Sequence, residues 1–107
     1  MTPVLVTTPT GRTVTVHFNS WLARCLKPGS VNNGVTLNAH HIYFARNYCT
    51  KYSLAHEIGH TNQAAVLGWK YLPWVMGCLL RYGYAHSPAE LAADAYMDAH
   101  ADEFTAL

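Results

Sequence analysis

Residues 54–63 read LAHEIGHTNQ, and the prediction of the fold starts from this stretch. His56 and His60 stand four residues apart, so on a helix they lie one above the other with Cβ atoms about 5–6 Å apart. Glu57 lies about 100° around the helix from His56, because 3.6 residues make one turn. Apolar residues recur with helical spacing in the same segment, at Leu54, Ile58 and Ala65. We therefore predict an amphipathic helix over residues 53–67.

The two histidines of this helix are suited to binding one metal ion. Imidazole nitrogens at this spacing can both reach a zinc ion at about 2.0–2.1 Å. Glu57 would flank the ion, where it could accept a proton from water. The alternative is a helix with two hydrogen-bonded histidines and no metal.

A catalytic zinc site needs a third protein ligand. Glu90 is the best-placed candidate because it lies near the start of a predicted helix that begins at Ser87. His86 and His100 remain alternatives. Asp94 follows Glu90 by one helical turn, and a carboxylate there could accept the second ring N–H of a ligating histidine.

Glu90 also has a simpler interpretation. Ser87 fits a helix N-cap and Pro88 the first helical position, so Ser87 and Glu90 have the spacing of a capping box. Further acidic residues continue the spacing of four, at Asp98 and Asp102. In this interpretation the acidic row is simply a solvated helix face.

The first third of the chain favours strands. Residues 12–18 alternate apolar and polar side chains, with Val14, Val16 and Phe18 on one face. Residues 4–8 precede this segment across a turn, which predicts a hairpin. The apolar positions in 35–44 change parity midway, which indicates a bulge or two short strands.

The rest of the chain favours helices. The most apolar segment, 64–80, is shorter than the ~20 residues of a membrane span, and we predict a buried helix or helix pair there. A further helix is predicted over 87–104. The fold class is α+β, with a small antiparallel or mixed sheet in the N-terminal third followed by about three helices, and His-Glu-x-x-His on the first helix. We expect one domain over 1–107, with the sheet at about 3–48 and the helices at about 50–106.

The amino-acid composition limits which kinds of molecule this protein is expected to bind. The chain has 107 residues, of which 50% are hydrophobic and 12% charged, and the net charge is +1. The near-neutral net charge shows no electrostatic footprint for binding nucleic acid or an anionic membrane. The low charge favours a protein partner or self-association. The N-terminus shows no signal peptide and the cysteines (Cys25, Cys49 and Cys78) form no motif, so we expect a cytoplasmic protein.

Two motifs, His56-Glu57-x-x-His60 and Glu90-x-x-x-Asp94, together resemble those of the gluzincin metallopeptidases, and the small size resembles the minigluzincins. Residues 33–98 are also similar to small bacterial and phage domains with the same two motifs. The resemblance implies one zinc ion bound by His56, His60 and Glu90, with Glu57 as general base and acid. Asp94 would orient a ligating histidine.

The resemblance further implies that the strand near 35–44 forms the rim of a cleft for extended peptide. Asn62 departs from the family pattern, which has an apolar residue there. The longer gluzincins also have a C-terminal subdomain with a transition-state-stabilising histidine, whereas only a short tail follows Asp94 in this sequence. Residues just before Glu90 are candidates to replace that histidine, namely Tyr82, Tyr84 and His86.

Two functions remain open at this point. The first is a zinc metallopeptidase in which Glu57 takes a proton from the attacking water and returns it to the leaving amine. The second is a latent or non-enzymatic zinc-bearing domain for interaction or assembly, which an exposed aromatic patch would favour.

Overall fold

The computed structural model describes residues 3–21, 23, 34–83 and 86–107, and the fold within them is α+β, as predicted. The strands form one mixed sheet in the order β1-β2-β4-β3, comprising β1 (Val4–Thr7), β2 (Thr13–His17), β3 (Gly34–Asn38) and β4 (His41–Phe44). The helices follow the sheet, comprising α2 (Lys51–Leu67), α3 (Tyr71–Tyr82) and α4 (Pro88–His100). Short 3-10 turns follow α2 and α4, namely η1 (Gly68–Lys70) and η2 (Ala101–Glu103).

The predicted hairpin is confirmed, because β1 and β2 pair antiparallel. Val14 and Val16 are fully buried, as their alternation predicted. The change of parity in 35–44 is also explained. Two short antiparallel strands, β3 and β4, replace one long strand, and their register shifts between Thr36 and Asn38.

A parallel pairing joins the two hairpins into one sheet, with Val16 of β2 opposite Ile42 of β4. Arg12, just before β2, links this sheet to α2 by hydrogen bonds. Its Nε donates to the carbonyl oxygen of Ala39 at 2.9 Å, and one terminal nitrogen donates to Oδ1 of Asn62 on α2 at 2.8 Å. This contact explains why a polar residue occupies position 62.

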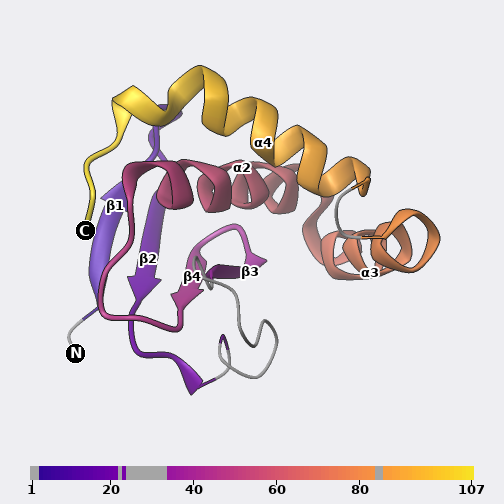
Figure 1. The fold of residues 1–107 in the computed structure, drawn as a ribbon, viewed down its shortest axis with the longest axis horizontal. Helices are drawn as coiled ribbons and strands as arrows, with labels where there is room; N and C mark the ends of the chain where they lie inside the picture. Colours follow the sequence, from indigo (N-terminus) through magenta and orange to yellow (C-terminus); the bar gives the residue numbers. More distant parts are fainter. Residues whose placement is uncertain (1–2, 22, 24–33, 84–85) are drawn as a thin grey trace.

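Helix α2 packs against the sheet, and α4 packs along the other side of α2 (Figure 1). The core lies between the sheet and α2, where Ile42, Leu54 and Ile58 are fully buried. Gly59 allows α4 to lie close, since a Cβ there would meet the Cα of Ala93 at 3.2 Å. Helix α2 therefore covers the sheet, and α4 packs on α2 rather than on the strands.

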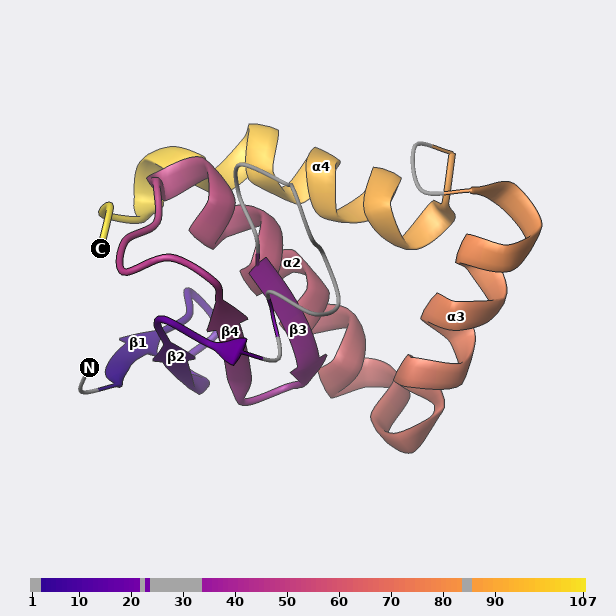
Figure 2. The same cartoon turned by 60° about the horizontal axis from the view of Figure 1, so that its bottom comes forward.

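The prediction that the apolar segment 64–80 is buried is wrong. Helix α3 projects from the end of the layer formed by α2 and α4, as Figures 1 and 2 show, and only Tyr71 and Cys78 of α3 are buried. A chain of this size forms one core, and α2 already covers that side of the sheet. Ala65, predicted to face the core, is exposed in the last turn of α2. Among the described residues, no helix has the length and hydrophobicity needed to cross a bilayer.

Candidate metal centre

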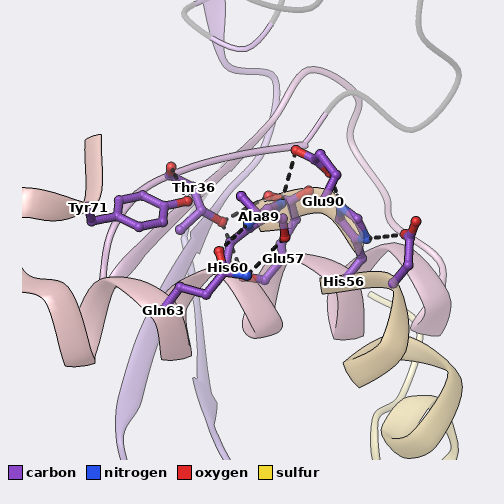
Figure 3. Close-up of polar contacts among 9 residues, drawn as sticks. Thr36, His56, Glu57, His60, Gln63, Tyr71, Ala89 and Glu90 are labelled. Atoms are coloured by element: carbon purple, nitrogen blue, oxygen red, sulfur yellow. Dashed lines mark hydrogen bonds and ion pairs between the residues drawn. The ribbon is translucent and has the colours of Figure 1, made fainter. Parts of the chain in front are cut away.

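The three predicted ligands come together at the contact between α2 and α4. One ligand atom each from His56, His60 and Glu90 lies within 4.8 Å of the other two. His56 Nε2 is 2.9 Å from Oε2 of Glu90, and His60 Nε2 is 3.3 Å from Oε1 of the same carboxylate. Figure 3 shows both imidazoles and Glu90 gathered at this point. The arrangement can hold one metal ion.

The second nitrogen of each imidazole is held by a partner of its own. His56 Nδ1 lies 2.9 Å from Oδ1 of Asp94, the residue predicted to orient a histidine. His60 Nδ1 lies 2.9 Å from Oε1 of Gln63, whose Nε2 donates to the carbonyl oxygen of Ala89 at 2.9 Å. These acceptors assign the proton of a neutral ring to Nδ1 in both histidines, because an Nδ1–H can donate to them. The Nε2 lone pairs then face Glu90.

In this arrangement the Nε2 atoms of His56 and His60 have no favourable electrostatic partner when both rings are neutral. Two neutral imidazoles would direct lone pairs at a carboxylate, which is unfavourable in a buried site. The repulsion would be removed if both rings gained a proton, or if one cation were bound between the two imidazoles and the Glu90 carboxylate. Burial lowers the pKa of His60, but its hydrogen bond to Glu90 and the charges of Glu57 and Glu90 outweigh burial, so its pKa is raised. The site thus attracts positive charge, and its donor set fits a divalent metal.

Glu57, the predicted base, lies beside this cluster and is buried. Thr36 of β3 donates its hydroxyl hydrogen to Oε1 of Glu57 at 2.8 Å. Gly34 of the same strand makes room for the carboxylate, because a Cβ at position 34 would lie 2.9 Å from Cγ of Glu57. Strand β3 therefore holds the side chain of Glu57 in place.

Tyr71, at the start of α3, is a neighbour of the site that the sequence did not indicate. Its hydroxyl donates to the carbonyl oxygen of Thr36 at 3.3 Å, and Figure 3 shows its ring pointing toward Thr36. Burial raises the pKa of Tyr71, and the charges of Glu57 and Glu90 raise it further. The phenol therefore stays a neutral hydrogen-bond donor beside Glu57. No motif marks Tyr71, Thr36 or Gly34, because each reaches the site only through folding.

The other candidates that the structure describes lie outside the cluster. Tyr82 and His86 are exposed, and Tyr84 lies outside the described residues. His100 forms an ion pair with Glu103 at the far end of α4. It is therefore not the third ligand.

The capping-box interpretation of Glu90 needs a correction. Ser87 is the N-cap of α4 and Pro88 opens the helix, as predicted. However, the Ser87 side chain makes no capping hydrogen bond, and its buried Oγ has no hydrogen-bond partner among the described residues. The Glu90 carboxylate is directed at Nε2 of His56 and at Nε2 of His60.

Comparisons with protein-family models, with curated proteins and with solved structures find no match to this chain. The function must therefore be argued from the geometry of the site and from its motifs.

Proposed function

We propose that this protein is a zinc-dependent peptidase with the minimal site of a gluzincin. The observation that carries the proposal is the convergence of His56, His60 and Glu90 next to a buried, held Glu57. A structural metal site needs ligands but no base beside them. The pairing of a metal-binding cluster with a positioned carboxylate is typical of hydrolysis.

Zinc is the metal that best fits these donors. Two imidazole nitrogens and one carboxylate form the ligand set of catalytic zinc in peptidases, with a fourth position left for water or substrate. Asp94 and Gln63 supply the acceptors that orient the two histidines. When bound, zinc would supply a Lewis acid that polarises a peptide carbonyl and makes water more acidic.

Glu57 is proposed to move the proton. Its carboxylate would accept a proton from the attacking water and deliver it to the nitrogen of the leaving amine, acting first as base and then as acid. The hydrogen bond from Thr36 keeps Oε1 in one position, so the other oxygen, Oε2, is proposed to carry the proton. Restricting the carboxylate in this way lowers the entropic cost of the transfer.

The substrate is proposed to be an extended peptide that adds to β3. This strand stands at one end of the sheet order and pairs on its inner side with β4. Its residue Thr36 touches Glu57, so a peptide paired along β3 would pass next to the base. Backbone pairing of this kind binds peptides with little dependence on their side chains. Tyr82, Tyr84 and His86 stay candidates for stabilising the transition state.

Metal content tests the site directly. We expect about one zinc per chain in the parent and loss of zinc in both His60→Ala and Glu90→Ala. His100→Ala is the matched control, because this histidine lies outside the cluster and the variant should keep its zinc. Equal zinc in the parent and in His60→Ala would remove His60 as a ligand.

Cleavage of a peptide library tests the activity. Glu57→Gln should keep its zinc and lose at least about 100-fold in kcat, because the amide cannot accept the proton. Glu103→Gln, a change of the same kind on an exposed residue, should cleave like the parent. A Glu57→Gln variant that cleaves normally would rule out the proposed base.

One observation favours a second function, a zinc-bearing interaction domain without catalysis. Trp69, Leu80 and Met76 form part of an exposed apolar surface around α3, and such a surface is typical of proteins that bind a partner. A parent protein that binds zinc but cleaves no peptide in the library would support this alternative.

A further inference from the structure

Helix α3 presents an apolar surface that no described part of the chain covers. Leu72, Met76 and Leu80 recur every fourth residue, so they form one row along the helix. Their exposed fractions are 44%, 56% and 85%. The buried residues of α3, Tyr71 and Cys78, lie on the other side of the helix. The exposed row therefore faces away from the body of the protein, from which α3 projects (Figure 2).

One aromatic side chain, Trp69, adds to this row at the start of the helix, whereas Trp74 and Tyr82 lie about 160° around α3 from their nearest row members. Trp69, in the turn before α3, is 81% exposed, and Trp74 and Tyr82 are also exposed. We call the apolar row together with Trp69 the α3 surface, which comprises Trp69, Leu72, Met76 and Leu80. Soluble monomeric proteins rarely expose apolar side chains so densely, and such surfaces mark contacts with proteins or lipids.

Apart from the histidines, the charged residues of α3 and of the chain segments next to it in sequence are both positive. Lys70 and Arg81 are the cations of this region, and residues 58–89 contain no Asp or Glu. Neither cation forms an ion pair with a described residue. Instead, Lys70 Nζ lies 5.8 Å from the centre of the Trp69 ring, and the Arg81 guanidinium lies 5.5 Å from that of Tyr82. The two cations thus lie beside the aromatic rings at opposite ends of α3, available to an anionic partner.

We propose that the α3 surface binds to anionic lipid bilayers, with α3 lying in the plane of the membrane interface. Leu72, Met76 and Leu80 enter the acyl region, and Trp69 lies at the level of the headgroups, where its amphipathic ring is favoured. Lys70 and Arg81 extend toward lipid phosphates while their methylene groups stay in contact with apolar atoms. The length of α3 fits this position, because about 12 residues span only about 18 Å as a helix.

The charge pattern favours a lipid surface over a second copy of the chain. Pairing α3 with itself in antiparallel fashion would bring Lys70 next to Arg81 of the other copy. Parallel pairing would bring each cation next to its own equivalent. No acidic residue between 58 and 89 is available to neutralise these contacts. An anionic lipid surface neutralises both cations at once.

Vesicle binding tests the proposal on the full chain. The probe is sedimentation with vesicles of phosphatidylcholine alone and of phosphatidylcholine with 30% phosphatidylglycerol, at ~0.1 M salt. We expect binding to the anionic vesicles that is on the order of 30-fold tighter than binding to the neutral ones, from two cations at the surface. The tryptophan emission should shift to shorter wavelength on binding. No binding of the parent to anionic vesicles would overturn the proposal.

Two variants separate the apolar and the electrostatic parts of the interaction. Leu80→Glu should weaken binding at least about tenfold, since a leucine that enters the acyl region in the bound state is replaced by a charge. Leu5→Glu is the matched control, because Leu5 is 70% exposed on β1, away from α3, and this variant should bind like the parent. The double variant Lys70→Gln/Arg81→Gln should bind anionic and neutral vesicles alike.

Each variant is at the surface, so its fold can be verified by circular dichroism before the binding measurement. Equal binding by Leu80→Glu and Leu5→Glu would overturn the proposed surface. A parent that forms dimers through α3, detected by light scattering and abolished by Leu80→Glu, and that ignores vesicles would assign the surface to a second copy instead. Because zinc content and peptide cleavage are measured separately, a failure here leaves the proposed peptidase function untouched, and the reverse also holds.

Discussion

Thr36 on β3 directs its hydroxyl at Glu57 on α2, with 2.8 Å between Oγ1 and the carboxylate Oε1 and 3.2 Å between Oγ1 and the backbone carbonyl oxygen of Glu57. One strand residue thus contacts both the main chain and the side chain of the proposed base. Tyr71 completes this connection by donating to the carbonyl oxygen of Thr36. The geometry of Glu57 therefore depends on β3 and α3 as well as on its own helix.

Replacing Thr36 by Val should weaken this positioning. The buried carboxylate of Glu57 loses a donor, which costs about 1–3 kcal/mol in the free energy of unfolding. We expect kcat for peptide cleavage to fall about tenfold, because Glu57 can rotate away from its productive position. Zinc content should not change, since Thr36 does not contact the cluster. Urea unfolding and cleavage assays measure the two effects.

Thr36→Ser is the matched control for this prediction, because it keeps the hydroxyl and removes only a methyl group. It should retain most of the activity that Thr36→Val loses. Equal activity of the two variants would show that the hydroxyl does not position Glu57.

Replacing Gly34 by Ala should destabilise the site by steric conflict. The new Cβ would lie 2.8 Å from Cε1 of Phe44 and 2.9 Å from Cγ of Glu57, closer than carbon atoms approach. We expect a loss of about 1–3 kcal/mol in the free energy of unfolding, as for other overpacked cores. Cleavage should fall together with stability, because one of the displaced groups is the proposed base.

Gly77→Ala is the matched control, since it makes the same chemical change where nothing lies within 4 Å of the new Cβ. In the middle of α3, Ala should stabilise the protein by about 0.5–1 kcal/mol. If Gly34→Ala were as stable as Gly77→Ala, the close packing of β3 on Glu57 would be disproved.

Asp94→Ala should weaken zinc binding without removing a ligand. Asp94 holds Nδ1 of His56, and loss of such an acceptor typically lowers metal affinity about 10–100-fold. Competition with a chromogenic chelator measures the change. Asp98→Ala, one turn further along α4 and exposed, should leave the affinity unchanged. Equal effects of the two changes would mean that the general charge of α4, and not the contact with His56, controls binding.

Tyr71 should make stability fall at high pH. Burial raises the pKa of its phenol above the ordinary value of 10.0, while in the unfolded chain the phenol ionises near that value. Above this pH the unfolded state therefore binds fewer protons than the folded state, so stability declines as pH rises. The contribution is fully present below about pH 10 and is lost as the pH rises toward the pKa of the folded state.

Urea unfolding of the metal-free protein at pH 8 and at pH 11 tests this prediction. Tyr71→Phe keeps the buried ring and removes the ionisable hydroxyl, so the difference in stability between the two pH values should be smaller than in the parent. An identical pH dependence in both proteins would show that Tyr71 does not carry it.

The elements near the metal cluster were predictable because local patterns determine them. The helical spacing of His56 and His60 places both side chains on one face, whatever the rest of the chain does. The alternation of Val14 and Val16 likewise predicted which face of β2 is buried. Glu90 and Asp94 were placed on a helix by the signals of Ser87 and Pro88, although the predicted capping role of the Ser87 side chain was wrong.

Whether the most apolar segment is buried could not be predicted from its composition. Hydrophobicity predicted burial for 64–80, yet α3 lies outside the core and exposes Leu72, Met76 and Leu80. Burial depends on whether another element offers a matching surface. In a small domain with one core, α2 occupies that place.

The sequence alone therefore determined the local features of this protein, namely its strands, its helices and the residue types that face one direction on each helix. Only the tertiary structure decided that Glu90 meets His56 and His60, that Asp94 orients His56, and that Gly34, Thr36 and Tyr71 surround Glu57. The physical reason is the sequence separation over which each kind of interaction acts. Backbone geometry and side-chain periodicity act over a few residues, whereas these contacts join residues tens of positions apart and exist only after the sheet and helices have packed.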